Sequence, residues 1–296
     1  MRSKLILFLV LAIAPVALKA QEAIKLVNYN VLHGFDNDST LENRFIQWAK
    51  KQNADVFTFQ ELNGFTQDRL EELAEKYGHP YAILNTGVTH PIGITSRYPI
   101  VMVQQVTTNM WHSYLYGNIN GVHFFVTHLS PFEVKKRRAD IDRILAHIRL
   151  LPPNEKVLVT GDFNSVAAVD SSHYGEKLAA AMRKSEGRLE PKSGLPIVRG
   201  KTIYRNNMDN GNIDYTVTNK MLAAGFYDSF YLRNKTFKPS APTEAHRGKD
   251  AILRRIDYIW VNGPLSKRVT AADVIHDAET KQLSDHYPVT ITFQLK

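Results

Sequence analysis

The chain contains no cysteine. This absence excludes disulfide bonds, lipid attachment through a cysteine, thiolate metal sites and cysteine nucleophiles. A chain of 296 residues, of which 44% are hydrophobic, is long enough to be stabilised by an apolar core instead. We therefore expect a globular protein that is held together by packing.

Long hydrophobic runs are also missing after the first twenty residues. Within them, two basic residues precede the apolar stretch 5–18, and the small residue Ala20 follows it. This pattern is typical of a secretory signal peptide, although Leu18 is bulkier than the residue usual at its position. The alternative, an uncleaved membrane anchor, needs about 20 apolar residues, and the stretch is shorter. We predict a signal peptide over residues 1–20 and a secreted or periplasmic protein.

Positive charge is only modestly in excess of negative charge. The formal net charge of +8 falls to +5 when Arg2, Lys4 and Lys19 of the predicted leader are removed. Such an excess favours anionic partners only weakly. The sequence has no internal repeat, low-complexity tract or linker, so we predict one domain over residues 21–296 and expect a monomer.

Short apolar segments alternate with amphipathic ones and predict an α+β fold. One amphipathic segment begins at Thr66, a helix-capping residue, and stops at Gly78. The predicted strands are 24–32, 55–62, 94–108, 113–121, 122–129, 155–161, 254–262, 269–277 and 289–295; the predicted helices are 41–54, 66–78, 133–151 and 172–185; and 186–212 is predicted to be a surface loop. Since few segments follow a strict βαβ order, we expect two packed sheets with helices outside.

Polar side chains recur at the ends of the predicted strands. Side chains alternate along a strand, so Asn30 ends the first strand on the face of Leu26, and Glu61 ends the second on the face of Phe57 and Phe59. Other strand ends carry His128, Asp162, Asn164 and the pair Asp285 and His286. Taken singly, each is explained by a turn, a solvated strand end or a partly buried histidine. Their recurrence in six segments favours a functional site.

Asp257 is predicted to point into a partly apolar layer, because it shares a strand face with Ile259 and Val261. A buried carboxylate without a partner is costly, so Asp257 needs a cationic or donor neighbour. His286 is the obvious candidate.

Seven motifs stand in an order that resembles the endonuclease/exonuclease/phosphatase superfamily. They are YNVLHG, FQEL, SRYPI, THLSPF, GDFN, RRIDYIWV and SDHYPV, and the resemblance spans residues 24–295. The superfamily includes deoxyribonucleases, apurinic-site endonucleases, sphingomyelinases and inositol-polyphosphate phosphatases. The resemblance implies a four-layer α/β/β/α sandwich of two mixed sheets, with the site at one edge of both sheets. It also implies metal-dependent hydrolysis of a phosphoester.

The resemblance also implies roles for individual residues. Asn30 matches the family's first-strand asparagine, and Glu61 matches its principal metal ligand. Asp162 and Asn164 match the pair that handles the attacking water and the phosphate. The remaining matches are Asp257 as the partner of the terminal histidine, Asp285 and His286 as the terminal pair, and His128 as the histidine of the deoxyribonuclease and sphingomyelinase branches.

These assignments agree with the chemistry of phosphoester hydrolysis. Glu61, Asn30 and Asp285 offer hard oxygen ligands that suit Mg²⁺ or Mn²⁺ better than zinc. His286, kept protonated by Asp257, and His128 are expected to donate to the phosphoryl group. Asp162 is the expected general base, and Asn164 is expected to orient the water or the substrate.

The sequence leaves the substrate open. The match of His128 to the deoxyribonuclease and sphingomyelinase branches favours a phosphodiester. Basic segments at 135–138 and 247–255 favour nucleic acid, although each is equally explained as a solvated surface. An exposed apolar loop around Trp111, within 109–117, would instead favour a phospholipid, and a sugar or inositol phosphate is the further alternative. A binding module without catalytic activity is disfavoured, because it would not need the full set of site residues.

Overall fold

The computed structural model describes residues 23–186, 198–199, 202–203 and 207–296. Two six-stranded sheets form its centre. The first sheet has the order β13 (Val269–Val274), β14 (Val289–Gln294), β1 (Ala23–Asn30), β2 (Val56–Gln60), β4 (Gly93–Ser96) and β3 (Tyr81–Leu84). The second has the order β11 (Phe226–Asp228), β12 (Asp257–Asn262), β8 (Lys156–Asp162), β7 (Val122–His128), β6 (Ser113–Ile119) and β5 (Val101–Val106).

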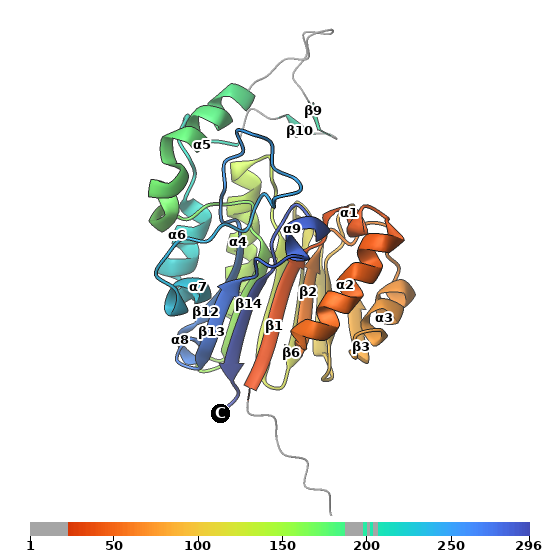
Figure 1. Ribbon diagram of the computed structural model, residues 1–296. Coiled ribbons are helices and arrows are strands. Elements are labelled where there is room, and N and C mark those ends of the chain that lie inside the picture. The colour runs from red at the N-terminus through yellow and green to blue at the C-terminus, as the bar shows by residue number, and fades with distance from the viewer. Residues whose placement is uncertain (1–22, 187–197, 200–201, 204–206) are drawn as a thin grey trace, which may run out of the picture.

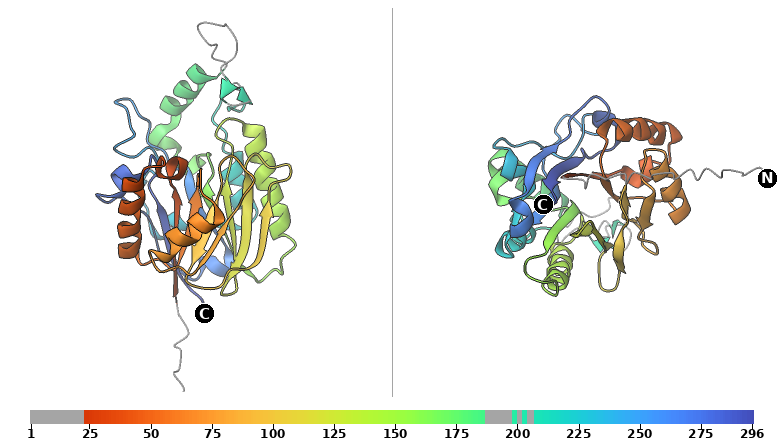
Figure 2. Two further views of the ribbon diagram at one scale, coloured as in Figure 1. Left: turned by 90° about the vertical axis from the view of Figure 1, so that its right-hand side faces the viewer. Right: turned by 90° about the horizontal axis from the view of Figure 1, so that it is seen from below.

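Helices cover the outer face of each sheet, as Figures 1 and 2 show. Helices α2 (Ser39–Gln52) and α3 (Gln67–Glu75) pack on the first sheet, and α4 (Val134–Ile148) and α6 (Thr216–Ala223) pack on the second. A third apolar cluster lies between the sheets and includes Leu26 and Ile259. The predicted four-layer α/β/β/α sandwich is therefore confirmed.

Helix α5 and several short elements complete the described part of the chain. They are α1 (Leu32–Phe35), the 3-10 helix η1 (Ala168–Asp170), α5 (Ser171–Ser185), the paired strands β9 (Val198–Arg199) and β10 (Thr202–Ile203), α7 (Ser229–Arg233), α8 (Gly263–Ser266) and α9 (Thr280–Leu283). Helix α5 contributes Leu178 to a small apolar cluster that also holds Ile256, at the upper end of the second sheet (Figure 1). Most of the predicted loop 186–212 lies outside the described residues.

Each sheet contains one parallel pair of strands that is joined by a helix. Strands β1 and β2 are parallel through α2, and β7 and β8 are parallel through α4. The helix starts follow local capping chemistry: the Asp38 side chain accepts from the Thr40 amide, and Thr66 accepts from the Arg69 amide. The predicted helix cap at Thr66 is thus confirmed.

The predicted strand 94–108 is wrong as a single strand. It is divided into β4 of the first sheet and β5 of the second, and residues 97–100 carry the chain from one sheet to the other. Pro99 has no amide hydrogen and cannot continue a ladder, which explains why pairing stops there. Strand β3 and helix α6 were not predicted.

The register of the strands brings the predicted site residues to one end of the sandwich. In the first sheet, Asn30 at the end of β1 pairs with Gln60 at the end of β2, while Ala23 at the other end pairs with Gln294. Both described chain ends therefore lie at the end opposite to α1 (Figure 1). Among the described residues, no helix has the length and apolar character needed to span a bilayer.

Candidate active site

Three polar residues form a row across the end of the second sheet. Asp162 on β8 is the register partner of both His128 on β7 and Asp257 on β12. Register partners on adjacent strands point to the same face of a sheet, here the inner face. All three side chains are buried, and the His128 Nε2 atom lies 3.5 Å from Asp162 Oδ2.

Gly161 allows β8 to approach β7 closely beside this row. Its φ angle is +147°, and a Cβ atom at this position would clash with the carbonyl oxygen of Thr127 on β7. A side chain is therefore excluded at the glycine of the GDFN motif. The motif pairs this glycine with the carboxylate that it helps to position.

The first sheet supplies Asn30 and Glu61. Asn30 Nδ2 donates to Glu61 Oε1 at 3.1 Å and to Asp162 Oδ2 at 3.2 Å, so one amide connects carboxylates from both sheets. Asn30 Oδ1 accepts from the Leu32 amide at 3.2 Å. In this orientation the Asn30 side chain donates to the two carboxylates, and its oxygen is bound to the Leu32 backbone amide instead of facing them.

The predicted facing of Glu61 is wrong. Phe57 and Phe59 pack under α2 and α3, whereas Glu61 points to Asn30 on the inner side. The reason is local: β2 ends at Gln60, and Glu61 has a φ of +61°, which breaks the alternation of side chains. Such left-handed backbone at a residue other than glycine is often found at functional sites.

Asp257 and His286 form a buried hydrogen-bonded pair. His286 Nδ1 lies 2.8 Å from Asp257 Oδ2, and Ser240 Oγ donates to the same oxygen at 2.7 Å. Ser240 Oγ accepts in turn from the Ile256 and Asp257 amides. The predicted neighbourhood of Asp257 and His286 is present, and Ser240 fixes the carboxylate from behind.

Opposing charges set the protonation of the pair and of Asp162. Burial alone would lower the pKa of His286, but Asp257, Asp285 and Asp162 together raise it well above its usual value. Burial and the neighbouring Asp257 and Glu61 carboxylates raise the pKa of Asp162 to about 8, although His286 and the Asn164 amide oppose the rise. His286 is therefore an imidazolium at neutral pH, and the raised pKa makes Asp162, once ionised, a stronger base than an ordinary aspartate.

His128 belongs to a cluster of three imidazoles, in which its ring stacks on that of His112. Its ring lies 4.7 Å from that of His112, which lies 4.8 Å from that of His90. Burial, with His90 and His286, lowers the pKa of His128 to about 3, so the ring is neutral. Its Nε2 atom lies 3.5 Å from Asp162 Oδ2 and 4.0 Å from Glu61 Oε1, and a neutral ring donates from one N–H only.

Asn164 and Asp285 form the rim of the site. Asn164 has a φ of +45°. Its backbone amide donates to Asp162 Oδ1 at 2.8 Å, and its side-chain Nδ2 donates to the Leu129 carbonyl. Asp285 Oδ1 lies 3.9 Å from His286 Nε2, and its side chain is 37% exposed. All eight predicted site residues thus lie at one end of the sandwich, and Asp285 is the most accessible member of the terminal pair.

The donor set fits a divalent cation. The carboxylates of Asp162, Asp257 and Asp285 surround His286, and the Glu61 carboxylate is linked to Asp162 through the Asn30 amide. Ligand atoms of Asp162, Asp257 and His286 lie within 4.8 Å of one another. Negative charge exceeds that of the single imidazolium, and oxygen donors dominate, as hard cations require. Because Asp257 and His286 bind each other, Glu61 is the side chain best placed to hold the ion at the open side.

Two residues of the site were missed by sequence reasoning. Ser240 holds Asp257, but the surrounding KPSAPT stretch contains no signal that distinguishes this serine from a turn residue. Arg254 is near the carboxylates, and its signal was its position three residues before Asp257, in the basic segment 247–255.

The family model for the endonuclease/exonuclease/phosphatase family matches residues 27–286. The chain belongs to this family. It is therefore a metal-dependent phosphoester hydrolase, and the family resemblance found in its motifs is confirmed. A comparison with curated proteins finds no match.

Solved structures of the same fold cover most of this phosphoesterase. An AP endonuclease from Archaeoglobus fulgidus has a TM-score of 0.66 at 17% identity, over 91% of this chain and 99% of the other. The 3′ phosphatase NExo from Neisseria, bound to product DNA hairpin, has a TM-score of 0.67 at 19% identity, with the same coverage of both chains. A 3′–5′ exonuclease, NExo from Neisseria meningitidis, has 0.66 at 18%, again over 91% and 99%. At these identities the likeness establishes a common fold.

Proposed function

We propose that this phosphoesterase hydrolyses phosphodiester bonds of nucleic acids with the help of Mg²⁺ or Mn²⁺. The observation that carries the proposal is the connected set of Glu61, Asn30, Asp162, His286 and Asp257, which joins the ends of both sheets. It combines carboxylate oxygens for a cation, a basic carboxylate and an imidazolium donor within one site. These are the groups that water attack on a phosphodiester requires.

The residues divide the chemistry between them. A divalent cation held by Glu61, with Asp285 or a turned Asn30 amide, would neutralise charge on the phosphate oxygens. Asp162 takes the proton of the attacking water, and the Asn164 amide keeps that carboxylate in place. His286, oriented through Nδ1 by Asp257, directs its Nε2–H to a phosphate oxygen, and His128 adds a neutral donor.

Two observations support nucleic acid over a phospholipid. The solved structures of similar fold include a 3′ phosphatase bound to a DNA hairpin. Trp111 packs against Phe132 and His112, with ring centroids 6.3 and 5.9 Å apart, so the 109–117 segment does not offer it as a free apolar loop.

The basic segments contribute less than their sequence suggests. Arg137 and Arg138 of the run 135–138 are bonded within the protein, and Arg255 is buried against Asp170 and Asp228. Lys135 and Lys136 remain exposed. The two basic segments therefore present separate exposed cations rather than a continuous track.

An assay across substrates tests the proposal. The mature protein would be incubated with Mg²⁺ or Mn²⁺ and plasmid DNA, RNA, sphingomyelin or sugar phosphates, with EDTA as the control. We expect metal-dependent cleavage of DNA or RNA, and an apparent affinity that falls steeply with salt as phosphate contacts are screened. Activity confined to lipid or sugar phosphates would overturn the choice of nucleic acid.

We also propose that residues 1–20 are removed during export and that the mature protein is a monomer. The apolar stretch 5–18 and the small residue Ala20 support the cleavage. Mass spectrometry of exported protein should give an N-terminus at Gln21 or its pyroglutamate form. Recovery of exported protein that retains residues 1–20 would contradict the proposal, and sedimentation would test the oligomeric state.

A further inference from the structure

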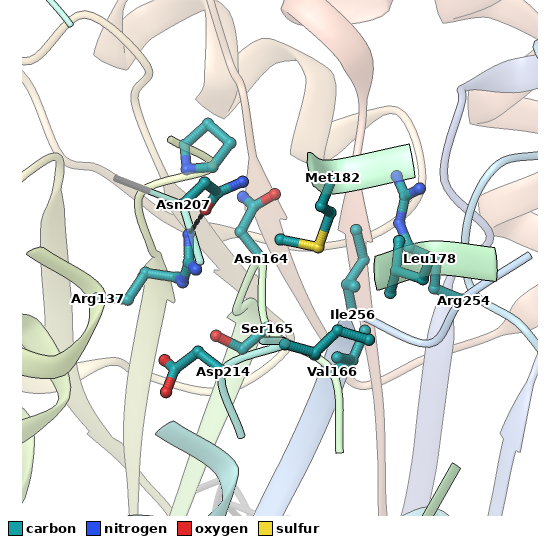
Figure 3. A pocket seen from close by; sticks show the side chains of 12 residues that line it. Arg137, Asn164, Ser165, Val166, Leu178, Met182, Asn207, Asp214, Arg254 and Ile256 are labelled. Carbon is teal, nitrogen blue, oxygen red and sulfur yellow. Dashed lines mark hydrogen bonds between the residues drawn. The ribbon is translucent and has the colours of Figure 1, made fainter. Parts of the chain in front are cut away.

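A cavity of about 180 Å³ opens directly beside the reaction centre. Figure 3 shows Asn164 at its edge, with Arg137 on one side and Arg254 on the other. Asn164 is also the residue whose amide holds Asp162. A group bound in this cavity would therefore be attached to, or next to, the phosphate that is cleaved.

One wall of the cavity is apolar. It is formed by Leu178 and Met182 of α5 and by Ile256, which precedes β12. Such a wall suits the flat, carbon-bearing face of a ring better than a free phosphate.

The opposite side holds buried polar atoms that have no hydrogen-bond partner among the described residues. These are Ser165 Oγ, Arg137 Nε and Asp214 Oδ2. Ser165, Arg137 and Asp214 are 4%, 3% and 4% exposed, so their unpaired atoms are costly unless a ligand or water meets them. One is a donor, one an acceptor and one both, which is the pattern that ring hydroxyls complement.

Arg254 adds a cation on the other side. Its guanidinium has no hydrogen bond or ion pair within the part of the chain that the structure describes. Burial lowers the pKa of Arg254, whereas Asp162, Asp285 and Asp257 raise it, so the side chain lies within electrostatic reach of the reaction centre. A guanidinium with free donors is suited to binding a phosphate.

Arg254 also borders a second cavity of about 260 Å³, which shares Leu178, Met182 and Asn207 with the first. Glu186 and Asp250 line this outer cavity. Their carboxylates disfavour an anion there, so a phosphate at Arg254 is expected on the inner side, toward Asn164.

We propose that the inner cavity is a substrate subsite for a hydroxylated ring that carries the scissile phosphate and a second phosphate. The ring lies on Leu178 and Met182, and its hydroxyls face Ser165 and Asp214. The second phosphate binds Arg254. The inference rests on the metal-dependent phosphoester hydrolysis of the proposed function, not on its choice of nucleic acid, and names the substrate class as a phosphorylated sugar or cyclitol ring. A ribonucleotide unit of RNA and a phosphorylated cyclitol share this chemistry.

Steady-state kinetics with four substrates test the subsite. They are a ribo-oligonucleotide, the deoxyribo-oligonucleotide of the same sequence, an inositol bisphosphate and bis(p-nitrophenyl) phosphate, which lacks both the sugar ring and the second phosphate. We expect kcat/KM for the preferred ring-bearing substrate, relative to the aryl diester, to fall at least tenfold in Arg254→Ala, mainly through KM. Arg254→Lys should recover part of the ratio, because it keeps the charge.

Ser165→Ala tests the hydroxyl recognition separately. We expect it to lower the preference for ribo- over deoxyribo-oligonucleotide severalfold. Arg149→Ala, which removes an exposed arginine at the far end of α4, is the matched control and should leave every ratio unchanged. Thermal unfolding of each variant would check that it is folded.

The outcomes separate the subsite from the proposed function. A preference for RNA that depends on Arg254 supports both the subsite and the choice of nucleic acid. A preference for the bisphosphate that depends on Arg254 supports the subsite and overturns the choice of nucleic acid. Equal losses on the aryl diester and the ring-bearing substrates in Arg254→Ala would overturn the subsite and leave the phosphodiesterase intact. Absence of metal-dependent cleavage of all four substrates by the unaltered protein would overturn both.

Discussion

His286 Nδ1 lies 2.8 Å from Asp257 Oδ2, and the two residues come from different sheets. Asp257 begins β12 of the second sheet, and His286 precedes β14 of the first. Both side chains are buried, so the bond forms only when the sheets are packed together. Assembly of the sandwich and assembly of the proposed catalytic pair are therefore the same event.

The pair should act as one unit. His286→Ala and Asp257→Asn are each expected to lower kcat/KM by about 10²–10⁴-fold, the range typical of a lost acid or base. The double variant should lose little more activity than the more impaired of the two single variants, because effects within a catalytic unit are not additive. Kinetics of the three variants on one phosphodiester check this, and fully multiplicative losses would show that the residues act separately.

Glu61 should control the dependence on the metal. In Glu61→Gln, the Mg²⁺ concentration for half-maximal activity should rise at least about tenfold, because a charged oxygen ligand is replaced by a neutral one. The unfolding temperature should change little, since glutamine keeps an oxygen that can accept from the Asn30 side chain or the His33 backbone amide. Glu72→Gln, at an exposed glutamate of α3, is the control. An unchanged metal titration in Glu61→Gln would remove Glu61 from the proposed metal site.

Gly161 should be intolerant of any side chain. Gly161→Ala would combine an unfavourable φ of +147° with a clash against the Thr127 carbonyl, and we expect a loss of about 3 kcal/mol or more in the free energy of unfolding. Gly263→Ala is the matched control, because a Cβ there meets nothing within 4 Å. Denaturant unfolding of both variants measures the difference, and equal stabilities would contradict the predicted clash.

His79 should make the protein sensitive to acid. Its Nε2 atom donates to the Ala54 carbonyl and its Nδ1 accepts from Thr95 Oγ1, while burial lowers the pKa of the ring to about 4. The unfolded chain therefore binds a proton that the folded protein does not, and stability falls as the pH decreases from about 6.5 to about 4. The contribution is about 1.4 kcal/mol per pH unit within that window.

The variant His79→Gln isolates this contribution. Glutamine keeps a donor and an acceptor but does not titrate, so the decline in unfolding free energy between pH 6.5 and pH 4 should become less steep. Denaturant unfolding at several pH values provides the measurement. Parallel curves for the two proteins would show that His79 is not the group responsible.

The sequence was most informative where the pattern of side chains and the motif residues agreed. The layers of the sandwich and the neighbourhood of Asp257 and His286 followed from strand periodicity and from the family motifs. Periodicity failed at Glu61, because the left-handed backbone that turns this side chain inward is a property of the strand end and not of the apolar pattern. It also failed at residues 94–108, where a continuous β-like sequence crosses between sheets.

Contacts between distant segments were beyond sequence reasoning. Ser240 reaches Asp257 from a loop, and Arg254 reaches the cavity only because α5 packs over the end of β8 and β12. The same limit applies to the charges of segment 135–138, which looked like a basic surface. The folded chain instead pairs Arg137 with the Ser130 carbonyl and Arg138 with Asp214.

The pairing of Ala23 with Gln294 has a practical consequence for handling the enzyme. Strands β1 and β14 run antiparallel side by side, so both described chain ends leave the sandwich on the side opposite to Glu61 and His286 (Figure 1). A tag, fusion partner or surface tether attached at the C-terminus would leave the end of the sandwich that holds the site facing away from the attachment point. A bulky polymeric substrate could then reach the site without contacting the attached group.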